Sequence, residues 1–202
     1  MRDPKVGPGA NRSQVSTADE YEQYFSDFLG LDNNNNGPQN QNFTGIGRLN
    51  YANGDTYEGK FLRGKIYGEG TLTQNGGKVV YKGSFQNGFK HGKGHQWDNA
   101  NQVEYEGNFE RNKIEGRGKM KDYRQQTEYD GMFRDGERHG DGQATYPNGN
   151  RFKGWWEANI PKKGELIMQG GDRLSGEWKD DRFSGAGQIL YRNGNVYEGE
   201  WK

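Results

Sequence analysis

One segment of the sequence has the spacing of a phosphate-binding loop. Residues 54–60 read Gly-Asp-Thr-Tyr-Glu-Gly-Lys, which places two glycines and a lysine where such loops hold phosphates. The next position needs a Ser or Thr hydroxyl for Mg²⁺, but here it is Phe61. The segment also reads as a hairpin turn and a strand, with no helix after it. We therefore predict no nucleotide site at this position.

The other polar residues do not form a catalytic pattern. His91 and His139 each precede a glycine of a repeating motif, so they read as turn residues, and the carboxylates are scattered singly. The sequence contains no cysteine, which excludes a disulfide scaffold and a thiolate metal site. We expect no enzymatic activity, no cofactor and no metal.

The composition favours a thin sheet over a thick globular core. Hydrophobic residues make up only 29% of the chain, whereas aromatic residues reach 13% and there are 34 glycines. Lys plus Arg and Asp plus Glu are both 28, so no net positive field favours nucleic acid. The sequence shows neither a secretory signal nor a long apolar stretch. The prediction is an intracellular protein that does not bind nucleic acid.

A five-residue pattern, aromatic-x-Gly-x-aromatic, repeats along the chain. Its first residues lie 24, 24, 24, 23, 22 and 23 positions apart, and Leu174 is the one first residue that is not aromatic. Alternation with period 2 is typical of a strand with one buried face. The predicted core residues of the repeat are Tyr57, Gly59, Phe61, Tyr81, Gly83, Phe85, Tyr105, Gly107, Phe109, Tyr129, Gly131, Phe133, Phe152, Gly154, Trp156, Gly176, Trp178, Tyr197, Gly199 and Trp201.

A second pattern, Gly-x-Gly-x-apolar, lies between these copies, as in residues 68–72. Its weakest copy is the fifth, where Lys162 replaces the first glycine. Tight turns with positive φ angles are expected at Asn53-Gly54, Asn148-Gly149 and Asn193-Gly194. Three longer connections, at 74–78, 98–102 and 123–127, are expected to carry a bulge or a wider loop.

These patterns predict an all-β fold, a single-layer antiparallel meander of seven stacked hairpins over residues 43–202. The first strand of each hairpin comes from the Gly-x-Gly pattern and the second from the aromatic pattern. Rings of one strand should lie over the glycine backbone of the next. One face of the strand at 57–61 and of the neighbouring strand at 68–72 is expected to carry Tyr57, Gly59, Phe61, Gly68, Gly70 and Leu72.

The motifs resemble the MORN repeat (membrane occupation and recognition nexus). Residues 57–61 and 197–201 match its Tyr-Glu-Gly-x-Trp/Phe unit closely. The resemblance implies an elongated, twisted antiparallel sheet. In this family the repeats are joined to an enzyme, joined to a membrane anchor, or make up most of the protein, as in radial-spoke and cytoskeletal scaffolds. No segment of this sequence resembles a kinase, a SET domain or an anchor, so the third group fits best.

The resemblance implies a scaffold or adaptor subunit that binds other proteins of a large intracellular assembly. The ciliary or flagellar axoneme or another cytoskeletal structure is the expected location. The alternative is a peripheral membrane module that binds anionic phospholipid. Neutral net charge makes the lipid alternative the less favoured one.

The face opposite the rings should be polar, and four apolar residues depart from that pattern. Met132, Trp155 and Ile167 fall on nearby strands, and Trp97 lies farther off. Exposed aromatic clusters often mark contact sites, so we predict a protein-binding surface here. The alternative is that the sheet curls and buries these side chains itself. The last strand is also expected to offer an open edge to a partner strand or to a second copy of the chain.

Residues 1–42 are predicted to form a flexible arm with a short amphipathic helix at about 17–30. Tyr21, Tyr24, Phe25 and Phe28 recur at helical spacing on one side, with acidic residues around them. These four residues are candidates for protein binding. Such a short helix is not stable alone and needs a surface, either the first edge of the sheet or a partner.

Overall fold

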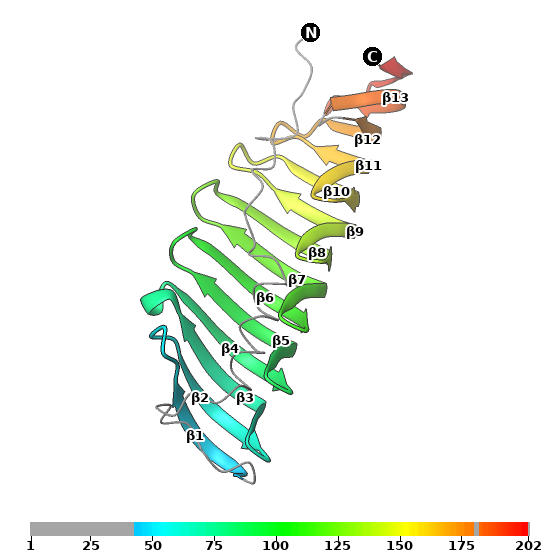
Figure 1. Cartoon of the computed structure of the whole chain (residues 1–202). Coiled ribbons are helices and arrows are strands. Elements are labelled where there is room, and N and C mark those ends of the chain that lie inside the picture. Colours follow the sequence, from blue (N-terminus) through cyan, green and yellow to red (C-terminus); the bar gives the residue numbers. More distant parts are fainter. Residues whose placement is uncertain (1–42, 180–181, 202) are drawn as a thin grey trace. The chain divides into compact units, whose positions relative to one another are not determined.

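The computed structural model describes residues 43–179 and 182–201, which form strands joined by short connections. Strand order follows chain order in one open antiparallel sheet, which confirms the predicted all-β meander (Figure 1). The predicted helix at 17–30, with Tyr21, Tyr24, Phe25 and Phe28, lies outside the described residues, as does Lys202. The strands are β1 (Gly45–Asn50), β2 (Thr56–Leu62), β3 (Lys65–Gln74), β4 (Val79–Gln86), β5 (Phe89–Asp98), β6 (Val103–Glu110), β7 (Lys113–Asp122), β8 (Thr127–Arg134), β9 (Glu137–Thr145), β10 (Arg151–Glu157), β11 (Ile160–Ile167), β12 (Arg173–Lys179), β13 (Arg182–Leu190) and β14 (Val196–Trp201).

The chain divides into two compact units, with the boundary between Gly116 and Arg117 in β7. In residues 43–116, strands β1 to β6 pair in succession. In residues 117–201, strands β8 to β14 do the same. The even-numbered strands carry the aromatic pattern and the odd-numbered strands carry the Gly-x-Gly pattern, as the sequence predicted.

A line of glycines runs across the strands of each unit, because the register places glycine opposite glycine in each described pair. The glycines of the first unit are Gly47, Gly59, Gly70, Gly83, Gly94 and Gly107. Those of the second unit are Gly131, Gly142, Gly154, Gly164, Gly176, Gly187 and Gly199. A β-carbon added at Gly83 would lie 2.5 Å from the Cα of Gly94, so the strands meet too closely here for any other residue.

Rings pack over this glycine line and against each other. A β-carbon at Gly83 would also lie 2.8 Å from the Tyr81 hydroxyl oxygen, so the predicted nesting of rings over bare α-carbons is confirmed. Tyr81 makes edge-on contacts with Phe85 of its own strand and with Phe109 of the following hairpin, at centroid distances of 5.1 and 4.9 Å. Within each unit, neighbouring hairpins thus contact each other through aromatic pairs, which contribute beyond the area they bury.

The bulges do not lie in the long connections but at the first glycine of the Gly-x-Gly pattern. Gly68 has a φ of 71°, and the register between β2 and β3 shifts beside it, between Gly59 and Phe61. A β-carbon at Gly68 would lie 3.2 Å from the Lys60 side chain, which is on the polar face. The expectation that Gly68 shares a face with Tyr57 is therefore wrong, because the left-handed backbone turns this residue toward the other side.

The turns in which both central residues have positive φ angles are not the ones that the sequence predicted. The tightest turns follow the aromatic strands, where both central residues have positive φ, as in Arg63-Gly64 (49° and 75°). At Asn53-Gly54, only Gly54 has a positive φ. The Asn53 side chain instead accepts the Asp55 N–H at 3.0 Å, which closes the turn without a left-handed asparagine. The wider connection expected after β3 is present, over residues 75–78.

Candidate functional site

The aromatic face is closed by packing and by hydrogen bonds. The Tyr57 hydroxyl donates to the Lys60 carbonyl at 3.0 Å, and the Tyr129 hydroxyl donates to the Met132 carbonyl at 3.0 Å. Burial of both hydroxyls raises the pKa of Tyr57 and of Tyr129 to about 12. These tyrosines are therefore structural donors rather than acid or base groups for chemistry near neutral pH.

The large side chains predicted to form the repeat core are buried in the described sheet, with two exceptions at β14. Tyr197 is 51% exposed and Trp201 is half-buried. In the earlier hairpins the corresponding tyrosine lies under the glycines of the next strand, as Tyr81 does with Gly94. No described strand follows β14 to cover Tyr197 in this way. The indole N–H of Trp201 is also buried without a hydrogen-bond partner.

Two of the four predicted contact residues lie together on the polar face of the second unit. Met132 of β8 is 41% exposed and Trp155 of β10 is 49% exposed. β9 lies between them: Gly140 lies under the Met132 side chain, and the His139 ring lies 6.1 Å from the Trp155 ring, edge to face. Met132, His139 and Trp155 therefore make one patch, which we name the Trp155 patch.

The other two predicted residues are not part of this patch. Ile167 is half-buried near the end of β11 and pairs with Arg151, whereas Trp155 pairs with Lys163. Four residues along a strand place Ile167 roughly 13 Å from that point. Trp97 is half-buried in β5 of the first unit, and its indole N–H donates to the Asn99 side chain. Periodicity found the right face but could not show which residues are neighbours.

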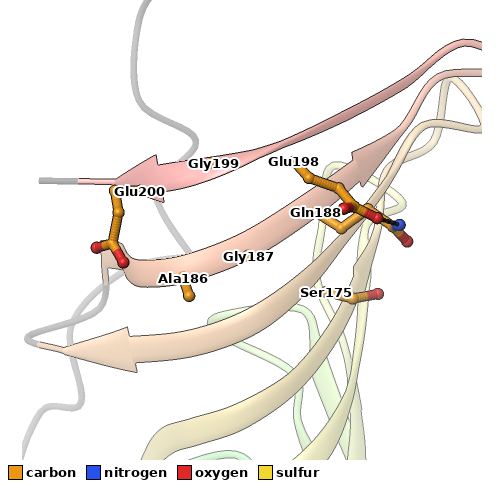
Figure 2. A pocket seen from close by; sticks show the side chains of 7 residues that line it. All are labelled: Ser175, Ala186, Gly187, Gln188, Glu198, Gly199 and Glu200. Carbon is orange, nitrogen blue, oxygen red and sulfur yellow. Dashed lines mark hydrogen bonds between the residues drawn. The ribbon is translucent and has the colours of Figure 1, made fainter.

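A shallow hollow lies on the polar face of β12, β13 and β14 (Figure 2). Gly187 and Gly199 form its floor, and the side chains of Gln188, Glu198 and Glu200 rise around it. The Gln188 amide donates to the Glu198 carboxylate at 2.6 Å. Its walls provide no nucleophile with an adjacent base.

The described residues contain no group of three or more His, Asp or Glu side chains placed to hold a metal. His91 and His95 stand four residues apart, which is a ligand spacing on a helix, but both lie in strand β5. The His95 ring contacts the Glu104 carboxylate at 2.7 Å. Across the described part of the chain, no helix has the length and apolar character needed to cross a bilayer.

Comparison with protein families gives a match to the MORN repeat. The match covers residues 57–79, 81–100, 105–123, 129–151 and 175–196, more than half of the chain. This chain belongs to the MORN-repeat family. MORN repeats are generally scaffold modules that bind proteins or membranes, and the open sheet with one free polar face is consistent with that role.

Among solved structures, the MORN chain is similar to the TCP domain of SAS-4 (dCPAP) from Drosophila melanogaster, solved with a proline-rich motif of Ana2 (dSTIL). The identity is 11%, the TM-score is 0.49, and the alignment covers 85% of this chain and 96% of that domain. No curated protein gave a significant match. Neither comparison assigns a partner to this chain.

Residues 152–174 lie between two matched ranges and still form a hairpin. Lys162 stands where the other copies have their first glycine, and the register shifts between Trp155 and Trp156. The close crossing of Gly154 and Gly164 is retained, and a β-carbon at Gly154 would lie 2.6 Å from the Gly164 Cα. The hairpin therefore keeps the one contact that the fold requires most strictly.

Three exposed apolar residues of the first MORN unit were missed from the sequence: Ile46, Leu62 and Tyr67. They stand at positions that alternation assigns to the polar face, and each looked like an ordinary surface residue. Comparison of the hairpins with one another would have found them, because the same positions are polar or charged in the next three hairpins. Lys90 was also missed: it is buried, with its ammonium 2.6 Å from the Gln96 amide oxygen and 5.0 Å from the Tyr81 ring centroid.

Proposed function

We propose that this MORN-repeat chain is a non-enzymatic scaffold or adaptor subunit of a large intracellular assembly, in the ciliary axoneme or another cytoskeletal structure. The observation that carries the proposal is the Trp155 patch. A tryptophan and a methionine are about half exposed beside each other on a face with mostly polar side chains, and large aromatic side chains at such sites are frequent centres of protein binding. The family resemblance to repeat-only scaffolds supports the choice of assembly.

The patch has the composition of a small binding site. Trp155 offers a wide ring supported at its edge by His139, and Met132 adds an adaptable apolar side chain. Lys153 and Lys163 lie beside Trp155 on the same face and are exposed. Asp141 of β9 pairs with Trp155 of β10. An apolar centre with charged residues around it fits a protein partner better than a lipid headgroup.

Affinity purification from native cells tests the proposal. The full chain should recover axonemal or other cytoskeletal proteins, and Trp155→Ser should reduce their recovery by roughly ten-fold or more. Arg173→Ser is the matched control, because Arg173 is exposed on the same face at β12, outside the Trp155 patch, and should leave recovery nearly unchanged. Both variants should keep the wild-type unfolding midpoint. Equal recovery with Trp155→Ser, or recovery of no cytoskeletal protein, would reject the proposal.

The alternative is peripheral binding to anionic phospholipid. It is favoured by Arg117, Lys119 and Lys121, which are exposed on one strand of the second unit. Each of these bases already lies 3.4 to 3.5 Å from the carboxylate of Asp130 or Glu128, which reduces their attraction for an anionic surface. Sedimentation with vesicles that contain phosphatidylserine separates the two functions. Strong, salt-sensitive binding would favour the lipid alternative, and weak binding would favour the scaffold.

Strand pairing at β14, with another protein or with a second copy, stays a prediction. It is supported by Tyr197, which is about half exposed where the equivalent residues of earlier hairpins lie under glycines.

A further inference from the structure

The exposed large apolar side chains of the first unit all lie on its first three strands. Within the described residues 43–116, they are Ile46 of β1 at 76% exposure, Leu62 of β2 at 43% and Tyr67 of β3 at 44%. The Trp155 patch belongs to the other unit, so these residues need a separate explanation. We name this group the Ile46 surface.

The three side chains are neighbours on the polar face. Ile46 pairs with Lys60 in the β1–β2 register, and Leu62 lies two residues beyond Lys60 on the same face. Tyr67 lies in the bulge opposite Lys60, next to Gly68, against which the Lys60 side chain packs. The apolar stem of Lys60 therefore joins Ile46 to Tyr67 across about 10 Å, the width of two strand spacings.

These apolar residues break a pattern that the other hairpins keep. The position of Ile46 is charged in the next five hairpins and alanine in the last, and its equivalents are Glu69, Lys93, Arg117, Asp141, Lys163 and Ala186. The position of Leu62 is polar throughout, with equivalents Gln86, Glu110, Arg134, Glu157 and Lys179. Tyr67 corresponds to His91, Glu115 and His139 in the three repeats after it. The fold does not require apolar residues at these positions, so a contact made only by the first strands accounts for them better.

The Ile46 surface is bordered by basic residues. Lys60 lies at its centre, and Arg63 and Lys65 follow Leu62 at the two-residue turn. Arg48 lies two residues from Ile46 on the same face of β1. Among the described residues, these four bases form none of the ion pairs that the structure shows. An occupant with apolar and acidic side chains would complement this surface.

We propose that the Ile46 surface is the docking site of the chain's own residues 16–30. This segment carries Tyr21, Tyr24, Phe25 and Phe28 at helical spacing, together with Asp19, Glu20, Glu22 and Asp27. Residues 13–42 contain no Lys or Arg, so the segment is acidic where the surface is basic. As a helix, the stripe from Tyr21 to Leu29 would be about 12 Å long, close to the width of the surface.

Residues 16–30 are tethered close to the Ile46 surface, because they belong to the same chain as β1. Residues 30–42 lead directly to Phe43, which precedes β1, and a chain of this length spans at most roughly 45 Å. A tether of this kind gives an effective concentration in the millimolar range. Even a weak contact, too weak to form between separate molecules, is then mostly occupied. A short helix that is unstable alone gains the surface that it needs.

Hydrogen–deuterium exchange on the full chain tests the proposal. We expect amides of residues 20–29 to exchange on the order of ten-fold more slowly than amides in the Asn-rich residues 33–41. The triple variant Ile46→Lys, Leu62→Gln and Tyr67→His should remove this protection. Each substitution introduces the residue type that a later hairpin has at the equivalent position, namely Lys93, Gln86 and His91. The hairpins should therefore keep their fold. Amides of β2 to β5 in the same experiment report whether they do.

A matched control changes the same face farther along the unit. Lys82→Ala and Lys93→Ala lie on β4 and β5, outside the Ile46 surface, and should leave the protection of residues 20–29 unchanged. Raising the salt concentration should weaken the protection, since charge complementarity contributes to the contact. As a second variant, Tyr21→Ser with Phe25→Ser should also remove the protection, without touching the sheet.

Three results would overturn the proposal. One is rapid exchange of residues 20–29 in the wild-type chain. Another is protection that survives the triple variant while the β2 to β5 amides stay protected. The third is protection that appears only as protein concentration rises, which would assign the surface to a second copy or to another molecule. The Trp155→Ser result is independent of all three.

Discussion

Gly131 and Gly142 face each other across β8 and β9 without room for a side chain on either strand. A β-carbon at Gly131 would lie 2.5 Å from the Gly142 Cα and 2.5 Å from the Tyr129 hydroxyl oxygen. The tyrosine ring fills the volume that any other residue would need. At residue scale, the fold thus depends on the absence of a side chain as much as on the rings themselves.

Gly131→Ala should lower the free energy of unfolding by about 1–3 kcal/mol, because the added methyl group must displace backbone or the buried Tyr129 ring. The control is Gly170→Ala, in the same unit, where nothing lies within 4 Å of the added carbon and the φ angle is ordinary. Urea denaturation of the full chain gives both values. Equal midpoints for the two variants would contradict the close crossing of β8 and β9.

At the scale of the strand and its turns, the hairpins alternate between two kinds of connection. Two-residue turns with both residues at positive φ follow the aromatic strands, and wider turns with a side-chain hydrogen bond follow the Gly-x-Gly strands. The two-residue turns also bond to the preceding hairpin. The Asn112 N–H donates to the Lys90 carbonyl at 3.0 Å, and the Asn112 side chain accepts the Lys90 N–H at 2.8 Å. The tight turns at 63–64, 87–88, 111–112 and 158–159 are therefore part of the contact between neighbouring repeats.

Ala158 holds a φ of 47° in an exposed two-residue connection, a backbone region that a residue with a β-carbon enters at a steric cost. Ala158→Gly should raise the free energy of unfolding by roughly 0.5–1 kcal/mol, because glycine enters the left-handed region without the steric cost of a β-carbon. Ala186→Gly, in the middle of β13, should change stability in the opposite direction by a similar amount. Thermal unfolding of both variants checks the pair. Destabilisation by Ala158→Gly would show that the turn has another conformation.

Across the described sheet, aromatic rings line one face and few charged side chains are buried, so the stability of the sheet should depend on pH through a small number of buried groups. Lys90 is the clearest case: burial lowers its pKa from 10.5 to about 8, with Asp55 acting weakly in the other direction. Burial also raises the pKa of Tyr57 to about 12 and raises that of Tyr81 and Tyr105. All four groups lie in the first unit.

The stability of the first unit should therefore rise with pH and then fall. Below pH 8, Lys90 is protonated in both states and the full cost of burying its charge is present. Between pH 8 and 10.5 only the unfolded chain keeps that proton, so stability increases as pH rises. Above about pH 10 the unfolded tyrosines ionise first, and stability decreases again. Urea midpoints measured between pH 7 and pH 11 should pass through a maximum.

Lys90→Met should increase stability at pH 7 by on the order of 2 kcal/mol, since it removes the buried charge but also the hydrogen bond to Gln96. The variant should lose the rise above pH 8 and keep the fall at high pH. Lys93→Met, on the exposed side of the same strand, is the control and should keep both. If the stability of Lys90→Met still rises above pH 8, a group other than Lys90 causes the rise.

The Trp155 patch was less predictable than the fold, because its members become neighbours through the register of the strands. Period-2 alternation placed Met132 and Trp155 on the polar face, and both are exposed there. It also placed Ile167 with them, but the β10–β11 register separates Ile167 from Trp155. The His139 contact with Trp155 could not be read from spacing either, since it depends on the bulge at Gly140.

The strands, their order and the face on which the rings lie could all be predicted from the sequence, because short connections and a period of 2 leave one way to pair neighbouring segments. The spacing of the glycines also determined where strands cross. The positions of the bulges, and which exposed side chains are neighbours, became known only from the paired strands. Register and positive-φ glycines displace residues that simple alternation would place side by side, so the Trp155 patch and the Ile46 surface emerge only when the strands are paired.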